Sequence, residues 1–411
     1  MKKVILILCL VATFGFTACD NGLSKEQIAN DQMREIMQSL DAIGLSVAVV
    51  KESKLVYTGS LGFKNLEEGT LIGTDDLFRI ASVSKSFTAT AIMQLYEQGK
   101  FGLDDDVSDA FGMVVRNPGY PDIPITYRML LSHRSSLNDT TGYFSYNVID
   151  SQNNPEYWRA YNNYAPGTQY EYCNLGFNLL GALVEVHSGE RFDHYIDNHI
   201  VKPLNLTGGF NVDELDRAQF VTLYDFRDGE PFTSPEAYRS RGAQLENYTL
   251  GRGAVIFSPT GGMKIAPKDL AKHMLVQING GLCDGVQILQ PQSVALMQTP
   301  YLNQSSPYSN QIPHVEPDPA TLSPTRSGLL DGDYYGFALA TTDKLIEGET
   351  LIGHTGSSYG LYSAMFFSPQ KKFGIIMMTN GYPTQRDEND FITIQVDVIR
   401  ALYDIFIKGG K

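Results

Sequence analysis

Ser82 and Lys85, three residues apart, are the pair in this chain whose types and spacing could form a covalent intermediate. Apolar residues recur at helical spacing from Phe87 to Leu95, so Ser82 should lie at a helix N-terminus and Lys85 one turn later. Residues three apart share a helix face, and the ammonium can therefore reach the hydroxyl. The free N–H groups there would stabilise an oxyanion formed beside Ser82. The pair predicts a serine nucleophile activated by a lysine.

The same spacing has a purely structural explanation. A serine at the start of a helix is often only its N-cap, and Ser-x-x-Lys is common by chance. The chain holds a second copy from Ser368 to Lys371, between two apolar runs, where Ser-Pro-Gln-Lys-Lys predicts a hairpin turn. The choice between nucleophile and cap at Ser82 therefore depends on the rest of the chain.

Two further short motifs could line the same site. Tyr172-Cys173-Asn174 follows a Pro-Gly turn and precedes an apolar helix, where its side chains can be held rigidly. His354-Thr355-Gly356, followed by Ser357, lies on or next to a strand and can line the edge of a cleft. Neither pattern is unique, because His187-Ser188-Gly189 is also present, although a helix cap explains it better. Other Tyr-x-Asn triplets begin at Tyr161, Tyr301 and Tyr308.

The elements around these motifs fall into two groups. Both ends of the chain predict β-structure with a terminal helix: a helix over 24–42, a hairpin over 45–57, strands over 335–341, 350–353, 361–367 and 373–379, and a last helix over 392–405. The middle, from about 86 to 330, is helical and rich in loops, and 301–333 predicts a long surface insertion. The pattern favours an α/β (α+β) fold, with an antiparallel sheet from both chain ends, flanking helices and a helical part.

Aromatic residues are concentrated between 143 and 172. They could form ordinary packing in a loop-rich region or the wall of a site for an apolar or ring-bearing substrate, and the sequence favours neither. His133, at the end of a predicted helix over 125–131, is expected to be structural rather than catalytic.

Composition excludes some function classes. The 411 residues carry a formal net charge of −14, which argues against nucleic acid, whose phosphates require a basic face. Cys173 and Cys283 lie far apart in the sequence and are predicted to be free thiols. No histidine or cysteine spacing is typical of a metal site, so we predict no metal and no cofactor.

The N-terminus predicts export. Lys2 and Lys3 precede an apolar run from Val4 to Phe16, and the following residues up to Cys19 resemble a lipobox. We therefore expect residues 1–19 to be a lipoprotein signal peptide and the thiol of Cys19 to carry a lipid. The mature chain, 20–411, would then be a bacterial cell-envelope lipoprotein anchored to a membrane, at the periplasm or the cell surface.

Ser82-x-x-Lys85, Tyr172-x-Asn174 and His354-Thr355-Gly356, in this order, resemble the motifs of the serine penicillin-recognising hydrolases. The nearest branch looks like class C β-lactamases, DD-peptidases and related esterases. The resemblance implies a β-lactamase/transpeptidase-like fold in one catalytic domain over 20–411. Its sheet part would comprise about 24–80 and 335–411, and its mainly helical part about 86–330.

The resemblance also implies a role for each motif residue. Ser82 would attack a carbonyl and become acylated, while Lys85 and Tyr172 would share proton transfer, with the nearby cation lowering the pKa of the phenol. Asn174 would hydrogen-bond Lys85 and the substrate. The backbone N–H groups of Ser82 and Ser357 would form the oxyanion hole. The remaining motif residues, His354, Thr355 and Gly356, would line the strand edge. Which of Lys85 and Tyr172 is the base stays open.

The expected activity is hydrolysis of an ester, amide or β-lactam carbonyl, as in a carboxylesterase or a DD-peptidase, with acyl transfer to an alcohol or amine left open. Neutral His354 in place of the family's lysine supplies less positive charge for a carboxylate, which disfavours an efficient β-lactamase. The alternative from another class is a non-catalytic, tethered binder or sensor of peptidoglycan fragments or β-lactams. The small-molecule or peptide substrate is otherwise undetermined.

Overall fold

An eight-stranded antiparallel sheet is built from both ends of the chain in the computed structural model, which describes residues 23–301, 334–387 and 391–408. The strand order is β11 (Tyr334–Tyr335), β12 (Ala340–Thr342), β13 (Leu351–Ser358), β14 (Leu361–Ser368), β15 (Phe373–Gly381), β1 (Gly44–Lys51), β2 (Lys54–Asn65) and β3 (Thr70–Leu71). β1 pairs with β15 along its whole length, from Gly44 opposite Gly381 to Lys51 opposite Phe373. Three N-terminal strands, β1 to β3, therefore complete a sheet whose other five strands come from the last eighty residues.

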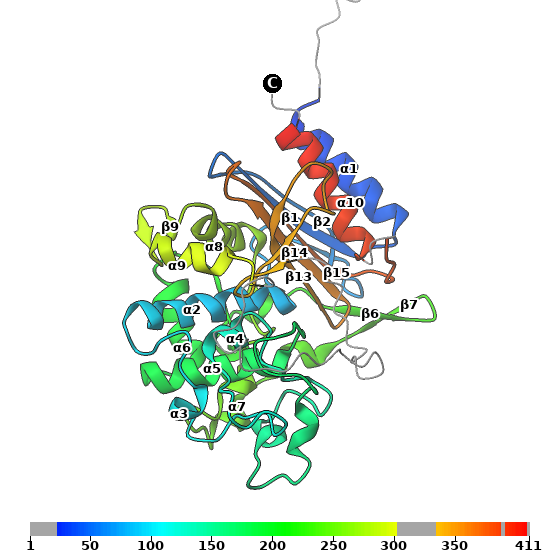
Figure 1. Ribbon diagram of the computed structural model, residues 1–411. Coiled ribbons are helices and arrows are strands. Elements are labelled where there is room, and N and C mark those ends of the chain that lie inside the picture. The colour runs from blue at the N-terminus through cyan, green and yellow to red at the C-terminus, as the bar shows by residue number, and fades with distance from the viewer. Residues whose placement is uncertain (1–22, 302–333, 388–390, 409–411) are drawn as a thin grey trace, which may run out of the picture.

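Two terminal helices cover one face of this sheet, α1 (Lys25–Ser39) and α10 (Thr393–Leu402). They lie side by side in Figure 1, in blue and red. α1 begins with a capping box between Ser24 and Gln27 and buries a stripe of apolar residues at helical spacing: Ala29, Met33, Ile36 and Met37. A π-helical segment, η11 (Tyr403–Lys408), continues α10.

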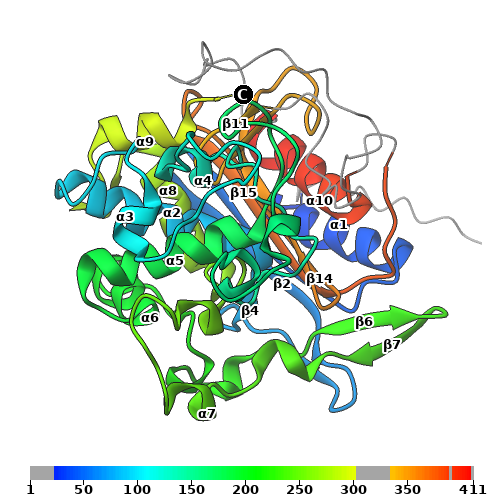
Figure 2. The ribbon, with the colours of Figure 1, turned by 60° about the horizontal axis from the view of Figure 1, so that its bottom comes forward.

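The opposite face of the sheet carries the helical part of the molecule. α8 (Pro267–Ile278) packs on β1 and β15. Beyond it, α2 (Lys85–Glu97) packs against α5 (Asn174–Ser188), and both helices are seen in the body of the molecule in Figure 2. The other helices are α3 (Val107–Phe111), α4 (Tyr127–Leu131), α6 (Phe192–Ile196), α7 (Gly242–Leu245) and α9 (Pro291–Gln298).

Short strands and 3-10 turns complete the helical part. β4 (Phe78–Arg79), β8 (Lys264–Ile265) and β5 (Gly208–Gly209) form a small sheet. A second hairpin, β6 (Tyr224–Arg227) and β7 (Glu230–Thr233), extends from the body in both ribbon views (Figures 1 and 2). The remaining segments are β9 (Leu282–Cys283), β10 (Val286–Gln287), η1 (Ala81–Ser84), η2 (Tyr146–Ile149), η3 (Tyr157–Ala160), η4 (Asp197–Val201), η5 (Val212–Glu214), η6 (Arg217–Gln219), η7 (Pro235–Tyr238) and η8 (Ala254–Phe257).

The predicted fold class is confirmed, because the sheet is antiparallel and has helices on both faces. Two strand predictions were wrong. The strand expected over 335–341 is broken into β11 and β12 by a turn at Ala338, whose φ is 59°. The strand expected over 350–353 continues to Ser358, since Thr355 and its neighbours pair with β14. The glycines and serines of this stretch resemble a turn in sequence, but the partner strand fixes them in the sheet.

Other predictions concern the termini, the insertion and the cysteines. Cys173 and Cys283 are both free and buried, as predicted. The signal peptide over 1–19, Cys19 and residues 302–333 of the predicted insertion lie outside the described residues. No helix within the described ranges is both long and apolar enough to cross a membrane. The domain boundaries stay a prediction.

Candidate active site

The candidate nucleophile, Ser82, lies in a strained turn. It belongs to η1, the 3-10 turn that leads directly into α2, and not to the first turn of α2 itself. Ala81 before it has a φ of 45°, a left-handed conformation that an alanine rarely adopts and that is typical of functional sites. The turn is held from outside, because the Ile80 N–H donates to the Met263 carbonyl at 3.0 Å and the Ser363 hydroxyl to the Ile80 carbonyl at 2.8 Å.

Lys85 is fully buried and points its ammonium at Ser82. Its Nζ lies 3.1 Å from the Ser82 Oγ, 2.8 Å from the Asn174 Oδ1 and 2.9 Å from the Thr260 carbonyl oxygen. Burial lowers the pKa of Lys85 to about 7, because desolvation disfavours the charged form more than the nearby Asp139 carboxylate favours it. A large fraction of Lys85 is therefore neutral near pH 7 and can accept a proton.

Tyr172 approaches the nucleophile from the other side. Its hydroxyl donates to the Ser82 Oγ at 2.8 Å, and the Lys85 Nζ lies 4.7 Å from its ring centroid. The expectation that a nearby cation lowers the pKa of this phenol was wrong. Burial raises the pKa of Tyr172 well above 10, and Lys85 offers little compensation because it is itself poorly charged in the same buried setting.

Asn174, the first residue of α5, links Lys85 to two residues that the sequence analysis missed, Asp139 and Thr260. The Asn174 Oδ1 accepts from Lys85 and from the Thr260 hydroxyl at 2.6 Å. Its Nδ2 and its backbone N–H both donate to the Asp139 Oδ2 at 2.9 Å, and the Leu175 N–H donates to the Oδ1 at 3.0 Å. Asp139 thus caps the N-terminus of α5 from a distant part of the chain. A helix cap normally lies next to its helix in the sequence, so no local pattern indicated Asp139 as the cap.

His354 lies within β13 and is buried, with 1% of its surface exposed. Its Nδ1 donates to the Thr355 carbonyl, so its Nε2 is the acceptor for the Tyr335 hydroxyl at 3.1 Å. Burial, and next the charge of Lys85, lower the pKa of His354 to about 3. The ring is therefore neutral near pH 7. Thr355 is half-buried and Ser357 is exposed, so these two, rather than His354, can contact a substrate.

Gly356 allows β13 to approach the turn that carries Ser82. A Cβ at this position would lie 2.4 Å from the Ile80 carbonyl oxygen and 3.2 Å from the Ala81 Cβ. Any larger residue would therefore push the strand away from η1. The close approach places Ser357 beside the nucleophile turn, where its backbone N–H is predicted to join that of Ser82 in the oxyanion hole.

His133 supports the site from behind. Its Nδ1 accepts from the Cys173 N–H at 3.1 Å, and its ring centroid lies 4.4 Å from that of Tyr172 and 4.9 Å from that of Tyr335. Burial holds the pKa of His133 well below its ordinary value, so it is neutral. This matches the structural role expected for it. Of the other aromatic residues between 143 and 172, Phe144 and Trp158 are more than half exposed, whereas Tyr146 and Tyr161 pack inside.

The second Ser-x-x-Lys copy forms no such site. Ser368 ends β14, Phe373 begins β15, and the residues between them form the predicted turn. The Lys371 ammonium binds both carboxylate oxygens of Glu349, at 2.6 and 2.7 Å. It is therefore held away from any role as a base for Ser368. His187-Ser188-Gly189 ends α5, and Gly189 is its left-handed cap, as predicted.

Comparison with known proteins decides the family. A family model described as Beta-lactamase matches residues 29–397, which is most of the chain. This protein belongs to the Beta-lactamase family. The resemblance drawn from the three motifs is therefore confirmed at the level of the family and of its β-lactamase-like fold.

Individual relatives in this family are distant. Penicillin-binding protein 4 of Amycolatopsis lactamdurans is 27% identical over 348 residues, or 82% of this chain and 81% of that protein. Protein flp of Staphylococcus aureus (strain N315) is 27% identical over 195 residues, or 44% of this chain, and the match spans only 39% of its length.

Two solved structures share the β-lactamase fold. The octameric penicillin-binding protein homologue from Pyrococcus abyssi has a TM-score of 0.67 at 24% identity, covering 93% of this chain and 77% of that one. The D-amino acid amidase from Ochrobactrum anthropi SV3, complexed with L-phenylalanine amide, has a TM-score of 0.66 at 20% identity, covering 93% and 99%. At this identity the likeness is one of fold alone.

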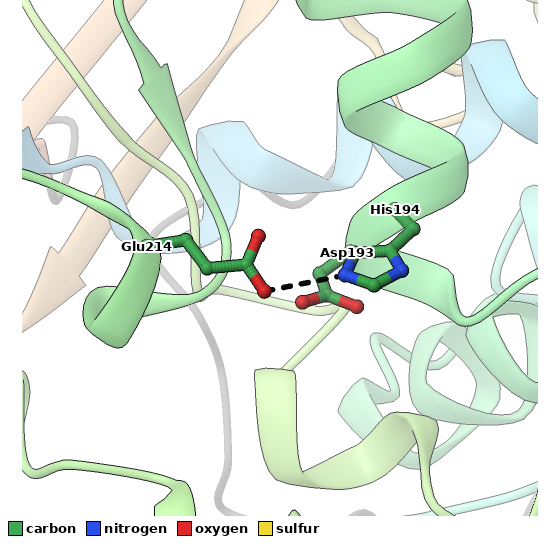
Figure 3. A group of neighbouring side chains, drawn as sticks. All are labelled: Asp193, His194 and Glu214. Atoms are coloured by element: carbon green, nitrogen blue, oxygen red, sulfur yellow. Dashed lines mark hydrogen bonds and ion pairs between the residues drawn. The ribbon is translucent and has the colours of Figure 1, made fainter.

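One group of possible metal ligands is separate from the residues around Ser82. Among the described residues, Asp193, His194 and Glu214 bring ligand atoms within 4.8 Å of one another (Figure 3). The Arg191 guanidinium contacts all three: it donates to Asp193 at 2.6 and 2.7 Å and to Glu214 at 2.8 Å, and it lies 2.6 Å from the His194 Nε2. The arginine supplies the positive charge that these acids need, so the group is best explained as an ion-pair network.

Proposed function

We propose that the protein hydrolyses ester or amide bonds through a Ser82 acyl-enzyme, with carboxylesterase or DD-peptidase-like activity. One observation carries the proposal: the Ser82 Oγ lies between the Lys85 Nζ, at 3.1 Å, and the Tyr172 hydroxyl, at 2.8 Å. A serine hydroxyl needs a base within hydrogen-bond reach to become a nucleophile, and a lysine whose pKa is lowered to about 7 supplies one.

The two neighbours take different roles in the proton transfers. Neutral Lys85 accepts the Ser82 proton as the Oγ bonds to the carbonyl carbon, and the resulting oxyanion is stabilised by the N–H groups of Ser82 and Ser357. Tyr172 stays protonated because burial raises its pKa, so it can donate to the leaving oxygen or nitrogen. It regains that proton from Lys85. A water molecule then attacks the acyl carbon and the same transfers run in reverse, which restores Ser82 and releases the acid.

Neutral His354 favours this activity over efficient β-lactam degradation. With its pKa lowered to about 3, it offers no positive charge on β13 for the carboxylate of a β-lactam. The name of penicillin-binding protein 4, matched over 81% of its length, agrees with a DD-peptidase-like substrate. Acyl transfer to an alcohol or amine in place of water remains compatible with the same intermediate.

The test compares Ser82→Ala with Ser368→Ala, which changes the serine of the second motif copy. Purified protein would be assayed with p-nitrophenyl esters, nitrocefin and D-Ala-D-Ala peptides, and labelled with a fluorophosphonate. Ser82→Ala should abolish turnover and labelling with the fold intact, while Ser368→Ala should retain both. Turnover that survives Ser82→Ala contradicts the mechanism. Labelling of Ser82 without turnover of any substrate would instead support the non-catalytic binder of peptidoglycan fragments or β-lactams.

We also propose that the protein is exported and tethered through a lipid on Cys19. The support is in the sequence: a charged start, an apolar run and a lipobox-like segment that ends at this cysteine. The enzyme would then act on acyl groups in the cell envelope.

A further inference from the structure

Two buried basic residues face each other in the short strand pair that leads into the nucleophile turn. In the small sheet, β4 pairs with β8 so that Arg79 lies directly opposite Lys264. Residues directly opposite in an antiparallel pair share a face, with Cβ atoms about 4.5–5.5 Å apart, and like charges there repel. Arg79 is 6% exposed and Lys264 2%. The pKa of Lys264 is held well below its ordinary value, by burial first and then by the charges of Arg79 and Arg241.

Neither cation has a carboxylate partner among the described residues. The Arg79 Nη1 makes one long hydrogen bond to the Ala237 carbonyl, at 3.4 Å, and its buried Nε has no acceptor there. The Lys264 Nζ donates to the Phe210 carbonyl at 2.6 Å. Buried charges are normally paired, because removing an ion from water is unfavourable by several kcal/mol. The unmatched guanidinium of Arg79 indicates a place for an anion.

The acids nearest to Lys264 are already neutralised by other arginines. Asp213 and Asp193 both act on its charge. Asp213, however, accepts from the Arg217 guanidinium at 2.9 Å, and Asp193 from that of Arg191 at 2.6 and 2.7 Å. Neither acid is therefore available to Arg79, which keeps a positive charge without a carboxylate partner among the described residues, whereas the lowered pKa of Lys264 favours its neutral form.

A third cation and a phenol extend the cluster towards solvent. Arg241 is half-buried, acts on the charge of Arg79, and donates its Nη1 to the Gln244 Oε1 at 3.2 Å. Tyr238, at the end of η7, has a buried hydroxyl whose oxygen faces the backbone N–H of Arg79 and whose own O–H reaches no acceptor among the described residues. Unmatched donors on a buried arginine and a buried phenol require an acceptor group with several oxygens.

The cluster lies beside the reaction centre and away from His354. Arg79 precedes Ser82 by three residues, and its guanidinium carbon lies 5.3 Å from the ring centroid of Tyr359. Tyr359 and Gly360 form the two-residue turn from β13 to β14, and Tyr359 follows Ser357 by two residues. His354 lies five residues back along β13, or about 16 Å at the rise of a strand. A carboxylate near Tyr359 would thus lie at the turn between β13 and β14, away from His354 in the middle of β13.

We propose that Arg79 and Arg241 bind a carboxylate of the substrate, so that the Ser82 reaction is selective for acyl compounds that carry a second, negatively charged carboxylate. A guanidinium binds a carboxylate through two parallel hydrogen bonds, which suits the unmatched donors of this cluster. The inference rests on the proposed function, since it names the substrate class of that same site. The carboxylate can belong to the acyl part or to the leaving group.

The test uses matched ester pairs that differ in one carboxylate. For the acyl part, 4-nitrophenyl hydrogen adipate is compared with 4-nitrophenyl hexanoate, and for the leaving group 4-acetoxybenzoate with its methyl ester. Each kcat/KM ratio is corrected for the uncatalysed rates. In the wild type at low salt, we expect at least one anionic ester to be favoured about tenfold or more, and the preference to shrink as salt screens the charges. The favoured pair identifies the side that carries the carboxylate.

Variants assign the preference to the arginines. Arg241→Ala should lower the anionic-to-neutral ratio about tenfold or more, and Arg241→Lys should restore part of it; Arg79→Gln should act in the same direction if it folds. Arg239→Ala is the matched control, because Arg239 is exposed and paired with Glu236.

The possible failures are distinguishable. Ser82-dependent turnover with no preference for either anionic ester, or a preference that Arg241→Ala leaves unchanged, overturns the carboxylate site and leaves the proposed function standing. An equal fall of the anionic-to-neutral ratio in Arg239→Ala would assign the preference to general surface charge and would also overturn the carboxylate site. No Ser82-dependent turnover of any ester contradicts the proposed function itself.

Discussion

At the scale of single residues, the reactivity of Ser82 depends on a lysine that is kept poorly charged. Among the described residues, Lys85 has three acceptors for its ammonium and no carboxylate in direct contact, and its burial lowers its pKa to about 7. Asp139 hydrogen-bonds Asn174, which in turn accepts from Lys85. Its negative charge partly opposes the lowering of the Lys85 pKa. The structure thus favours Lys85 as the base, a choice that the sequence left open.

The first prediction is a pH profile. Because only neutral Lys85 accepts the proton, kcat/KM for a neutral ester should rise about tenfold per pH unit below pH 7 and level off above it. Initial rates with p-nitrophenyl butyrate between pH 5 and 9 measure this. Glu171, whose pKa is raised to about 7 by burial and by Asp139, could produce a similar limb. Glu171→Gln is therefore the control, and a limb that vanishes in it contradicts the assignment to Lys85.

A second prediction concerns Asp139. Its charge raises the pKa of Lys85, so Asp139→Asn should move the acid limb to a pH below that of the wild type. The asparagine keeps an acceptor for the α5 N–H groups but loses the charge, and about 1 kcal/mol of helix capping stability should be lost with it. Thermal unfolding gives the stability change, and the pH profile gives the shift. An unmoved limb in a folded variant would show that Asp139 is only a cap.

At the scale of elements, the site is made where β13 meets the turn η1. The two are remote in sequence, and their contact depends on Gly356, whose missing side chain leaves room for the Ile80 carbonyl and Ala81. The same contact holds Ala81 in its left-handed conformation, since Ser363 of the next strand donates to Ile80. The sheet therefore shapes the nucleophile turn directly.

The third prediction tests this contact. Gly356→Ala should force β13 and η1 apart, because its Cβ would lie 2.4 Å from a backbone oxygen, and such overpacking is destabilising by about 1–3 kcal/mol. We expect kcat/KM to fall at least tenfold and Tm to drop. Gly209→Ala is the matched strand control, since its Cβ would meet only Leu215 at an ordinary 3.6 Å. Full activity in Gly356→Ala would rule out the close approach as a requirement.

At the scale of the whole molecule, the two ends of the chain are hydrogen-bonded to each other in the sheet, and the helical part between them faces it. The reacting groups come from both: Ser82 from η1, Lys85 from the start of α2, Tyr172 and Asn174 from just before and at the start of α5, and Ser357 from β13. The site needs both parts of the fold, since neither the helical part nor the sheet contains all of its groups.

The fourth prediction concerns where this molecule resides. Cys19→Ser should release the protein from membranes, because each buried CH₂ of a lipid chain contributes about 0.8 kcal/mol. Fractionation of cells and metabolic labelling with an alkynyl fatty acid measure this, with the wild type labelled and the variant not. A wild type without label, together with a variant that still sediments with membranes, would refute the lipid anchor.

The sequence by itself determined the family, the fold class and the motif residues, because these follow from local spacing. Ser82 and Lys85 share one helical turn, Tyr172 and Asn174 flank the start of a helix, and the apolar patterns of both chain ends predict strands. Local spacing also explained the second copy at Ser368 correctly as a turn. It placed the end of β13 wrongly, because a partner strand, not propensity, keeps its glycines and serines extended.

Only the tertiary structure decided the protonation of the site residues and which distant residues they contact. Burial lowers the pKa of Lys85 and raises that of Tyr172, because it disfavours the charged form of each group. How deeply a side chain is buried depends on the whole fold and cannot be deduced from its own position in the sequence. Asp139 reaches Asn174 from 35 positions earlier in the chain, and Arg79 lies opposite Lys264 only once β4 and β8 pair. Contacts of this kind arise from long-range packing, so no local pattern in the sequence could reveal them.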